Sequence, residues 1–142
     1  MKVSARNVFK GKVTKLTDGA VNAEVELTTA GGDKIVSMIT ESSVKSLGLA
    51  VGKEAIAIVK APWVTVVVGN SGIRFSTRNQ LHGKVKSIAT GAINTEVGIV
   101  LAGGETVFAV ITNDACRELE LKEGMDATAL IKASHVVLGV AD

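Results

Sequence analysis

Cationic and hydroxyl side chains recur at matching positions in the two halves of this 142-residue sequence. The first half contains Arg6, Asn7, Thr40, Lys60 and Ala61, and the same types return 72 positions later as Arg78, Asn79, Thr112, Lys132 and Ala133. A guanidinium fork and an ammonium group supply positive charge, a hydroxyl donates one directional hydrogen bond, and helix N-terminal amides carry partial positive charge. Each residue alone would be an ordinary surface charge or helix cap, but their joint recurrence favours binding of a tetrahedral dianion.

Catalytic chemistry is not indicated by the remaining polar residues. Nucleophilic or acid–base catalysis requires a convergent set of groups, such as a nucleophile with its base. His82, His135 and Cys116 have no residue of the same type at the matching position of the first half, and their spacing suits no transition metal. We expect surface or packing roles for these three side chains. The sequence therefore predicts a protein that is not an enzyme and needs no catalytic cofactor.

The recurrence extends over the whole chain and divides it into two units. Segments such as Gly11-Lys12-Val13 and Gly83-Lys84-Val85 match without a gap, as a duplicated structural unit would. The boundary falls in the turn-forming stretch Gly69-Asn70-Ser71-Gly72. We therefore predict one oxyanion-binding domain over residues 1–69 and a second over residues 73–142.

Each repeat is expected to contain five strands and one short helix. Alternating apolar and polar residues are typical of half-buried strands, and the Gly31-Gly32 pair predicts a hairpin turn. The expected strands of the first repeat are Ser4–Leu16, Val21–Leu27, Ile35–Ile39, Ala55–Lys60 and Val64–Val68. Thr40 is a suitable N-cap and Gly48 a suitable C-terminal stop for a helix between the third and fourth strands. This order predicts an all-β protein of two tandem five-stranded barrels of the oligonucleotide/oligosaccharide-binding (OB) fold type.

Composition limits the compartment and the partners. The chain is 46% hydrophobic with a mean hydropathy of +0.35, its net charge is only +2, and it has one cysteine. No apolar run is long enough for a spanning helix and no leader precedes Ser4, so we expect a cytoplasmic protein without a membrane partner. The weak net charge argues against nucleic acid. Two small cores without disulfides favour association into a homo-oligomer.

The motif Ser4-Ala5-Arg6-Asn7, followed by Gly11-Lys12-Val13, Ile39-Thr40 and Lys60-Ala61-Pro62-Trp63-Val64, resembles the Mop domain of molybdate-binding proteins. Two copies resemble a di-domain molbindin. The resemblance implies a trimeric protein for molybdenum storage and homeostasis, with molybdate or tungstate bound between domains of neighbouring subunits. The implied site residues are Ser4, Arg6, Asn7, Thr40, Ser43, Lys60, Ala61, Ser76, Arg78, Asn79, Thr112, Ala115, Lys132 and Ala133. Ala115 lacks the hydroxyl of its counterpart Ser43, so the two versions of the site are expected to differ.

A further oxyanion site on the threefold axis is also implied by the resemblance. The amides that it would use belong to the turns Gly19-Ala20 and Gly91-Ala92. Ordinary turn geometry also accounts for these glycines.

Two other functions compete with oxyanion binding. Barrels of this kind also bind single-stranded nucleic acid by stacking bases on aromatic side chains. This sequence has no tyrosine and only four other aromatic residues, Phe9, Trp63, Phe75 and Phe108. The chain could instead be a structural oligomerisation module in which the repeated cations are incidental. Molybdate and tungstate offer the same acceptors to the same donors, so the sequence does not separate them.

Overall fold

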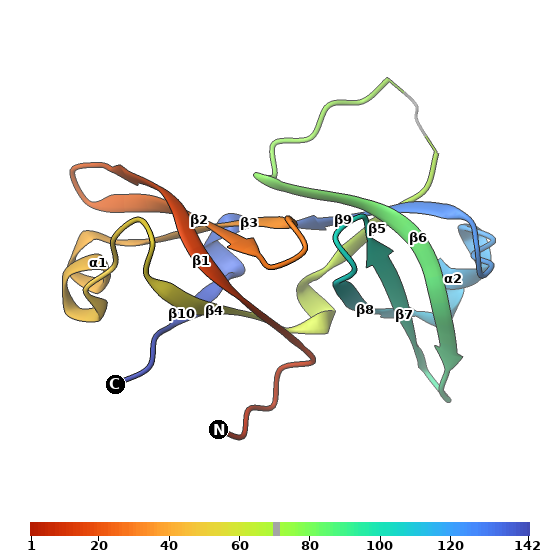
Figure 1. Cartoon of the computed structure of the whole chain (residues 1–142). Helices are drawn as coiled ribbons and strands as arrows, with labels where there is room; N and C mark the ends of the chain where they lie inside the picture. The colour runs from red at the N-terminus through yellow and green to blue at the C-terminus, as the bar shows by residue number, and fades with distance from the viewer. Residues whose placement is uncertain (70–71) are drawn as a thin grey trace.

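A computed structural model describes residues 1–69 and 72–142, and it contains two five-stranded antiparallel sheets (Figure 1). Asn70 and Ser71 of the expected boundary lie outside the described residues. The first repeat forms β1 (Asn7–Asp18), β2 (Asn22–Thr29), β3 (Lys34–Thr40), α1 (Glu41–Leu47), β4 (Glu54–Val59), the 3-10 helix η1 (Ala61–Trp63) and β5 (Thr65–Val67). The second forms β6 (Asn79–Thr90), β7 (Asn94–Leu101), β8 (Thr106–Thr112), α2 (Asn113–Glu118), β9 (Asp126–Ile131), the 3-10 helix η2 (Ala133–His135) and β10 (Val137–Gly139).

The predicted fold class of two five-stranded units with one helix after each third strand is confirmed. In β2, the side chains of Ala23, Val25 and Leu27 are buried, while the intervening residues are partly exposed. This alternation places one face of the curled sheet against the core, as period-two patterning requires. None of the described helices is long and apolar enough to cross a membrane.

The fifth strands are exchanged between the repeats. The strand order is β10-β4-β1-β2-β3 in one sheet and β5-β9-β6-β7-β8 in the other. Leu138 of β10 pairs with Ala57 of β4, and Val66 of β5 pairs with Ala129 of β9. Figure 1 shows β10 beside β4, on the side of the molecule formed by the first repeat. Each folded unit therefore combines four strands of one repeat with the fifth strand of the other, while the boundaries 1–69 and 73–142 stay a prediction for the sequence units.

The two short helices begin at the predicted threonines. The Thr40 hydroxyl accepts a hydrogen bond from the Ser43 amide at 3.1 Å, and Thr112 accepts one from the Ala115 amide at 3.0 Å. α1 ends at Gly48, whose φ of 60° lies in the left-handed region that glycine adopts without strain. Its counterpart in the second repeat is Glu120, a non-glycine residue with φ of 52°.

Matching residues of the two repeats also contact each other. The region where the two repeats meet is called the junction. The rings of Trp63 and His135 contact each other with centroids 4.6 Å apart and planes tilted by 39°, so His135 has the packing role, one of the two roles expected for it. The hairpin turns meet as well, since a Cβ atom on Gly31 would collide with the carbonyl oxygen of Gly103. Asp33 then accepts hydrogen bonds from the Gly103 and Glu105 amides at 2.8 and 3.3 Å. The two repeats are therefore in contact through an aromatic pair, a pair of hairpin turns and the hydrogen bonds of Asp33.

Candidate oxyanion-binding site

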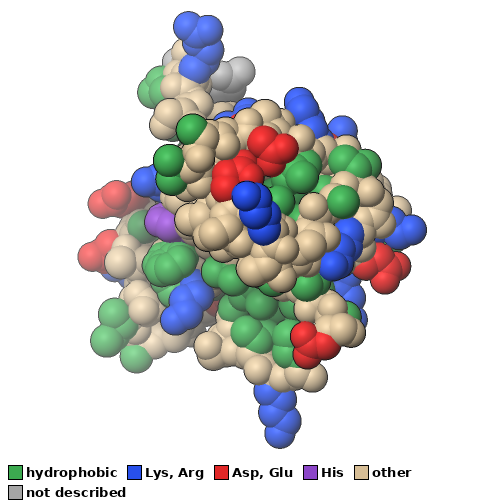
Figure 2. Space-filling view, turned by 90° about the vertical axis from the view of Figure 1, so that its left-hand side faces the viewer, with side chains coloured by type: hydrophobic (Ala, Val, Ile, Leu, Met, Phe, Trp, Pro, Cys, Tyr) green, Lys and Arg blue, Asp and Glu red, His purple; other side chains and the backbone are tan. Residues whose placement is uncertain are grey.

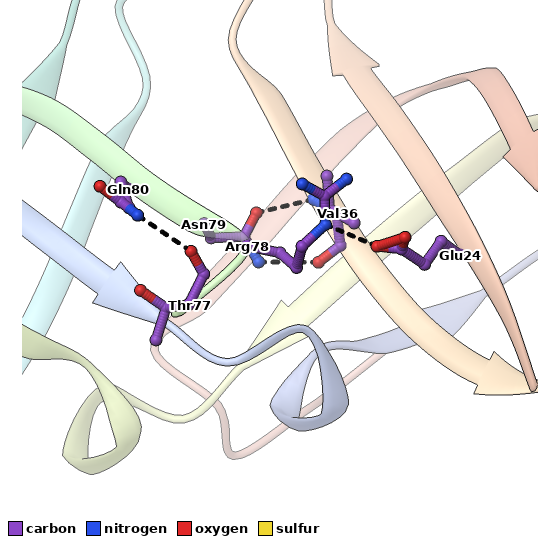
Figure 3. Close-up of polar contacts among 6 residues, drawn as sticks. All are labelled: Glu24, Val36, Thr77, Arg78, Asn79 and Gln80. Atoms are coloured by element: carbon purple, nitrogen blue, oxygen red, sulfur yellow. Dashed lines mark hydrogen bonds and ion pairs between the residues drawn. The ribbon is translucent and has the colours of Figure 1, made fainter. Parts of the chain in front are cut away.

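Asn7 and Asn79 join each repeat to the sheet of the other. The Asn7 side chain donates to the Phe108 carbonyl at 2.8 Å and accepts from the Phe108 amide at 2.7 Å. Asn79 makes the same pair of bonds to Val36, both at 2.7 Å (Figure 3). Both asparagines are only 2% exposed. Their carboxamides extend the hydrogen bonding of the edge strands β8 and β3, so these side chains position the neighbouring arginines.

Each arginine faces an acidic residue of the opposite repeat. Arg6 Nε lies 3.4 Å from Glu96 Oε2, and its guanidinium carbon lies 3.6 Å from the centre of the Phe108 ring. Arg78 Nε donates to Glu24 Oε1 at 2.6 Å. Figure 3 shows the two terminal nitrogens of Arg78 on the side away from that bond. These nitrogens keep the fork geometry that a bidentate contact with an oxyanion uses.

The lysines approach the opposite sheet through the 3-10 helices. Lys60 and Lys132 are exposed and occupy the N-cap positions of η1 and η2. η1 packs against β8, and η2 packs against β3. Ala61 and Ala133 are 3% and 7% exposed, which anchors each short helix beside its lysine. Both cationic segments of one repeat therefore lie against the edge strand of the other repeat.

Within one chain, the cations of each repeat lie beside the two strands of the other repeat that lead to its short helix. Glu24, the partner of Arg78, pairs across the sheet with Met38, and Thr40 follows two positions later on the same outer face of β3. By the same register, Glu96 pairs with Val110, two positions before Thr112.

This arrangement associates Arg78 and Lys132 with the helix start at Thr40 and Ser43. It associates Arg6 and Lys60 with Thr112 and Ala115. The sequence had instead predicted a grouping of the cations with the helix-start residues of the same repeat. Ser4 and Ser76 are exposed and lie two positions before the arginines.

Hydroxyl groups gather at the start of α1 only. Thr40 Oγ1 lies 2.9 Å from Ser43 Oγ and 3.2 Å from Ser42 Oγ. In α2 the matching residues are Asp114 and Ala115, and Asp114 pairs with Arg117. Each helix has one acidic residue in its first turn, so the two helix starts differ in the number of hydroxyl groups, as Ala115 led us to expect.

The turns proposed for a threefold-axis site are exposed, but the glycine amides are already bonded. Gly19 donates to Glu41 Oε1 at 3.0 Å, and Gly91 donates to the Asn94 carbonyl at 2.8 Å. Ala20 and Ala92 are exposed beside them. A threefold-axis role for these four residues stays a prediction.

Sequence reasoning missed Glu24 and Glu96 as members of the site. The period-two pattern accounted for them as the polar side of a strand. Their recurrence 72 positions apart was the available signal, since Glu26 on the same face of β2 is matched by Gly98. Among the described residues, no three His, Cys, Asp or Glu side chains form a metal-binding group.

The fold and the site define a tandem pair of small β modules that present cations and helix starts at their junction. The TOBE domain matches residues 3–66 and again residues 76–138, and the chain therefore belongs to the TOBE-domain family, with two tandem copies.

The relatives that it resembles bind molybdenum compounds or regulate transcription. The molybdenum-pterin-binding protein MopA of Rhodobacter capsulatus is 42% identical over 140 residues, which are 99% of this chain and 53% of that protein. The DNA-binding transcriptional dual regulator ModE of Escherichia coli is 32% identical over 97% of this chain and 52% of its own length. The chain thus spans about half the length of these relatives.

A solved structure matches both repeats of the chain. The cytoplasmic molybdate-binding protein ModG, in a form with molybdate bound, is 54% identical and superposes with a TM-score of 0.94 over 99% of this chain and 100% of that one. The tandem fold is therefore shared with a molybdate-binding protein.

Proposed function

We propose that this protein binds molybdate or tungstate reversibly in the cytoplasm, for molybdenum storage and homeostasis, and that it catalyses no reaction. The observation that carries the proposal is the paired arrangement at the junction. Twice in the molecule, an arginine and a lysine of one repeat lie against the edge strand that leads to a threonine-capped helix start of the other. Such a set offers charge and directed donors to a tetrahedral dianion.

The proposed ligand set is based on this geometry. Arg78, Lys132, Thr40 and Ser43 serve one version of the site. Arg6, Lys60 and Thr112 serve the other, beside Ala115, whose amide already donates to the Thr112 hydroxyl. Ser4, Ser76, Ala61 and Ala133 line the same segments, and Asn7 and Asn79 hold the arginines in place. The version with Ala115 has one hydroxyl fewer and is expected to bind more weakly.

A homotrimer is the proposed assembly, with sites completed by neighbouring subunits. Val21 and Ile93, at matching positions beside the β1–β2 and β6–β7 turns, are 71% and 76% exposed. Exposed apolar residues at equivalent points of both repeats suit a symmetric subunit contact. Light scattering at micromolar concentration should give the mass of a trimer, and a monomer mass would contradict this part of the proposal.

Single-stranded nucleic acid is the competing ligand. Figure 2 shows lysine and arginine side chains dispersed among acidic and uncharged groups on the face that it displays, without one continuous basic track. Phe9 is buried and Arg6 lies over the Phe108 ring, so among the described residues Trp63 and Phe75, 48% and 39% exposed, are the aromatic side chains most open to bases. Calorimetric titrations with molybdate, tungstate and single-stranded DNA at two salt concentrations test the proposal. Saturable oxyanion binding that persists at the higher salt supports it, and DNA binding without oxyanion binding overturns it.

A further inference from the structure

Glu24 and Glu96 are acidic residues inside a region otherwise suited to anions. Each is the partner of an arginine that comes from the opposite repeat, at 2.6 Å for Glu24 and 3.4 Å for Glu96. A carboxylate beside a site for a dianion is electrostatically unfavourable for the ligand. Its presence at both matching positions therefore requires an explanation beyond charge balance on the surface.

Stability alone does not provide that explanation. The side chains of Glu24 and Glu96 are 38% and 34% exposed, and those of Arg78 and Arg6 are 60% and 52% exposed. Ion pairs at this level of exposure contribute little to folding stability. The junction is already held by the buried bonds of Asn7 and Asn79, which need neither glutamate.

The geometry of the bond indicates what the carboxylates do. Glu24 holds Arg78 by Nε, so the terminal nitrogens stay available on the other side (Figure 3). An oxyanion bound to those nitrogens would lie across one guanidinium group from the carboxylate. It would gain a positioned donor and also meet a nearby negative charge.

We propose that Glu24 and Glu96 are built-in counter-anions that hold the arginines in place and lower the affinity for the bound dianion, which makes its binding reversible. This inference rests on the proposed function, because it concerns the same sites. The carboxylate repels the dianion more than it repels a monoanion of the same shape. The binding free energy gained on its removal should therefore be proportional to the charge of the ligand.

The test uses Glu24→Gln, Glu96→Gln and the double variant in the 142-residue chain. Glutamine keeps an oxygen that accepts the Nε hydrogen bond and removes only the charge. Glu26→Gln is the matched control, because Glu26 lies on the same face of β2 and faces Lys34 at 3.9 Å instead of an arginine of the other repeat. Molybdate and the tetrahedral monoanion perrhenate serve as probes, measured by calorimetry at low and high salt.

The double variant should bind molybdate on the order of tenfold more tightly than the natural sequence, and perrhenate about threefold more tightly. The difference should shrink at high salt, and Glu26→Gln should stay within about twofold. Unchanged or weaker molybdate binding by both single variants, with the natural protein binding normally, would overturn the counter-anion role alone. Absence of molybdate binding by the natural protein would overturn the proposed function and this inference together.

Discussion

Neighbouring residues of one motif have different tasks at the junction. Arg6 and Asn7 are adjacent, and both were expected to contact the anion. Consecutive side chains at the start of a strand point in opposite directions, so only one of them faces outwards. Asn7 points inwards, where a buried carboxamide must find partners, and the edge strand β8 provides both. The motif therefore combines Arg6, a proposed anion ligand, with the buried residue that positions it.

Replacing the buried carboxamide should destabilise the junction. Asn79→Ala removes both bonds to Val36 and leaves the amide and the carbonyl of that residue without this partner. We expect a loss of about 2 kcal/mol in the free energy of unfolding, measured by urea denaturation. Asn22→Ala, at an exposed position, is the control and should change stability little. Equal stability of the two variants would contradict the positioning role.

Charge should matter more than the hydroxyl group in binding. A hydrogen bond to a charged group contributes about 1.5 to 3 kcal/mol and a neutral one about 0.5 to 1.5 kcal/mol. Lys60→Ala should therefore weaken its site by about one to two decades, and Thr40→Ala by about one decade or less. Calorimetry with molybdate measures both effects, with the exposed Lys45→Ala as control. Unchanged affinity and stoichiometry in a double Lys60→Ala, Lys132→Ala variant would refute the site assignment.

At the scale of elements, local sequence patterns predicted the positions and types of the strands and helices better than they predicted which strands pair. The alternation around Val25 predicted β2, and Thr40 and Gly48 marked both ends of α1. These features depend on residues close together in the sequence. By contrast, Thr65–Val67 has only three residues, and its pattern fits the edge of either sheet equally well. The exchange of fifth strands and the pairing of Arg78 with Glu24 depend on long-range geometry, so the sequence pattern could not predict them.

The turn after α2 contains a residue that is poorly suited to its backbone conformation. Glu120 has φ of 52°, and its amide bonds to the Arg117 carbonyl as Gly48 bonds to Lys45. In the left-handed region of backbone conformation, residues with a Cβ atom are sterically strained, while glycine is not. Glu120→Gly should therefore raise the free energy of unfolding by about 0.5 to 1 kcal/mol, and Gly48→Ala should lower it by about 1 kcal/mol. Thermal and urea denaturation of both variants measure this, and destabilisation by Glu120→Gly would contradict it.

At the scale of the whole molecule, strand exchange makes each half depend on the other. The first sheet lacks its fifth strand until the C-terminal end of the chain is in place, and the second sheet takes β5 from the first repeat. The arginine, lysine and asparagine residues cross the same junction. The candidate sites are therefore assembled by the contacts between the repeats. Loss of the fifth strand of one repeat should therefore destabilise the sheet of the other repeat.

Removal of residues 137–142 tests this dependence directly. The truncation deletes β10, whose partner is β4 of the first repeat, with Val137 opposite Ile58 and Gly139 opposite Ile56. Hydrogen–deuterium exchange should become faster in peptides containing Ile56–Ile58, because these residues lose their edge partner. Peptides from β9 should stay protected by β5, which pairs with residues 128–130. A chain ending at Gly139 keeps β10 and serves as control. Faster exchange in β9, with β4 unchanged, would show that each fifth strand belongs to its own repeat.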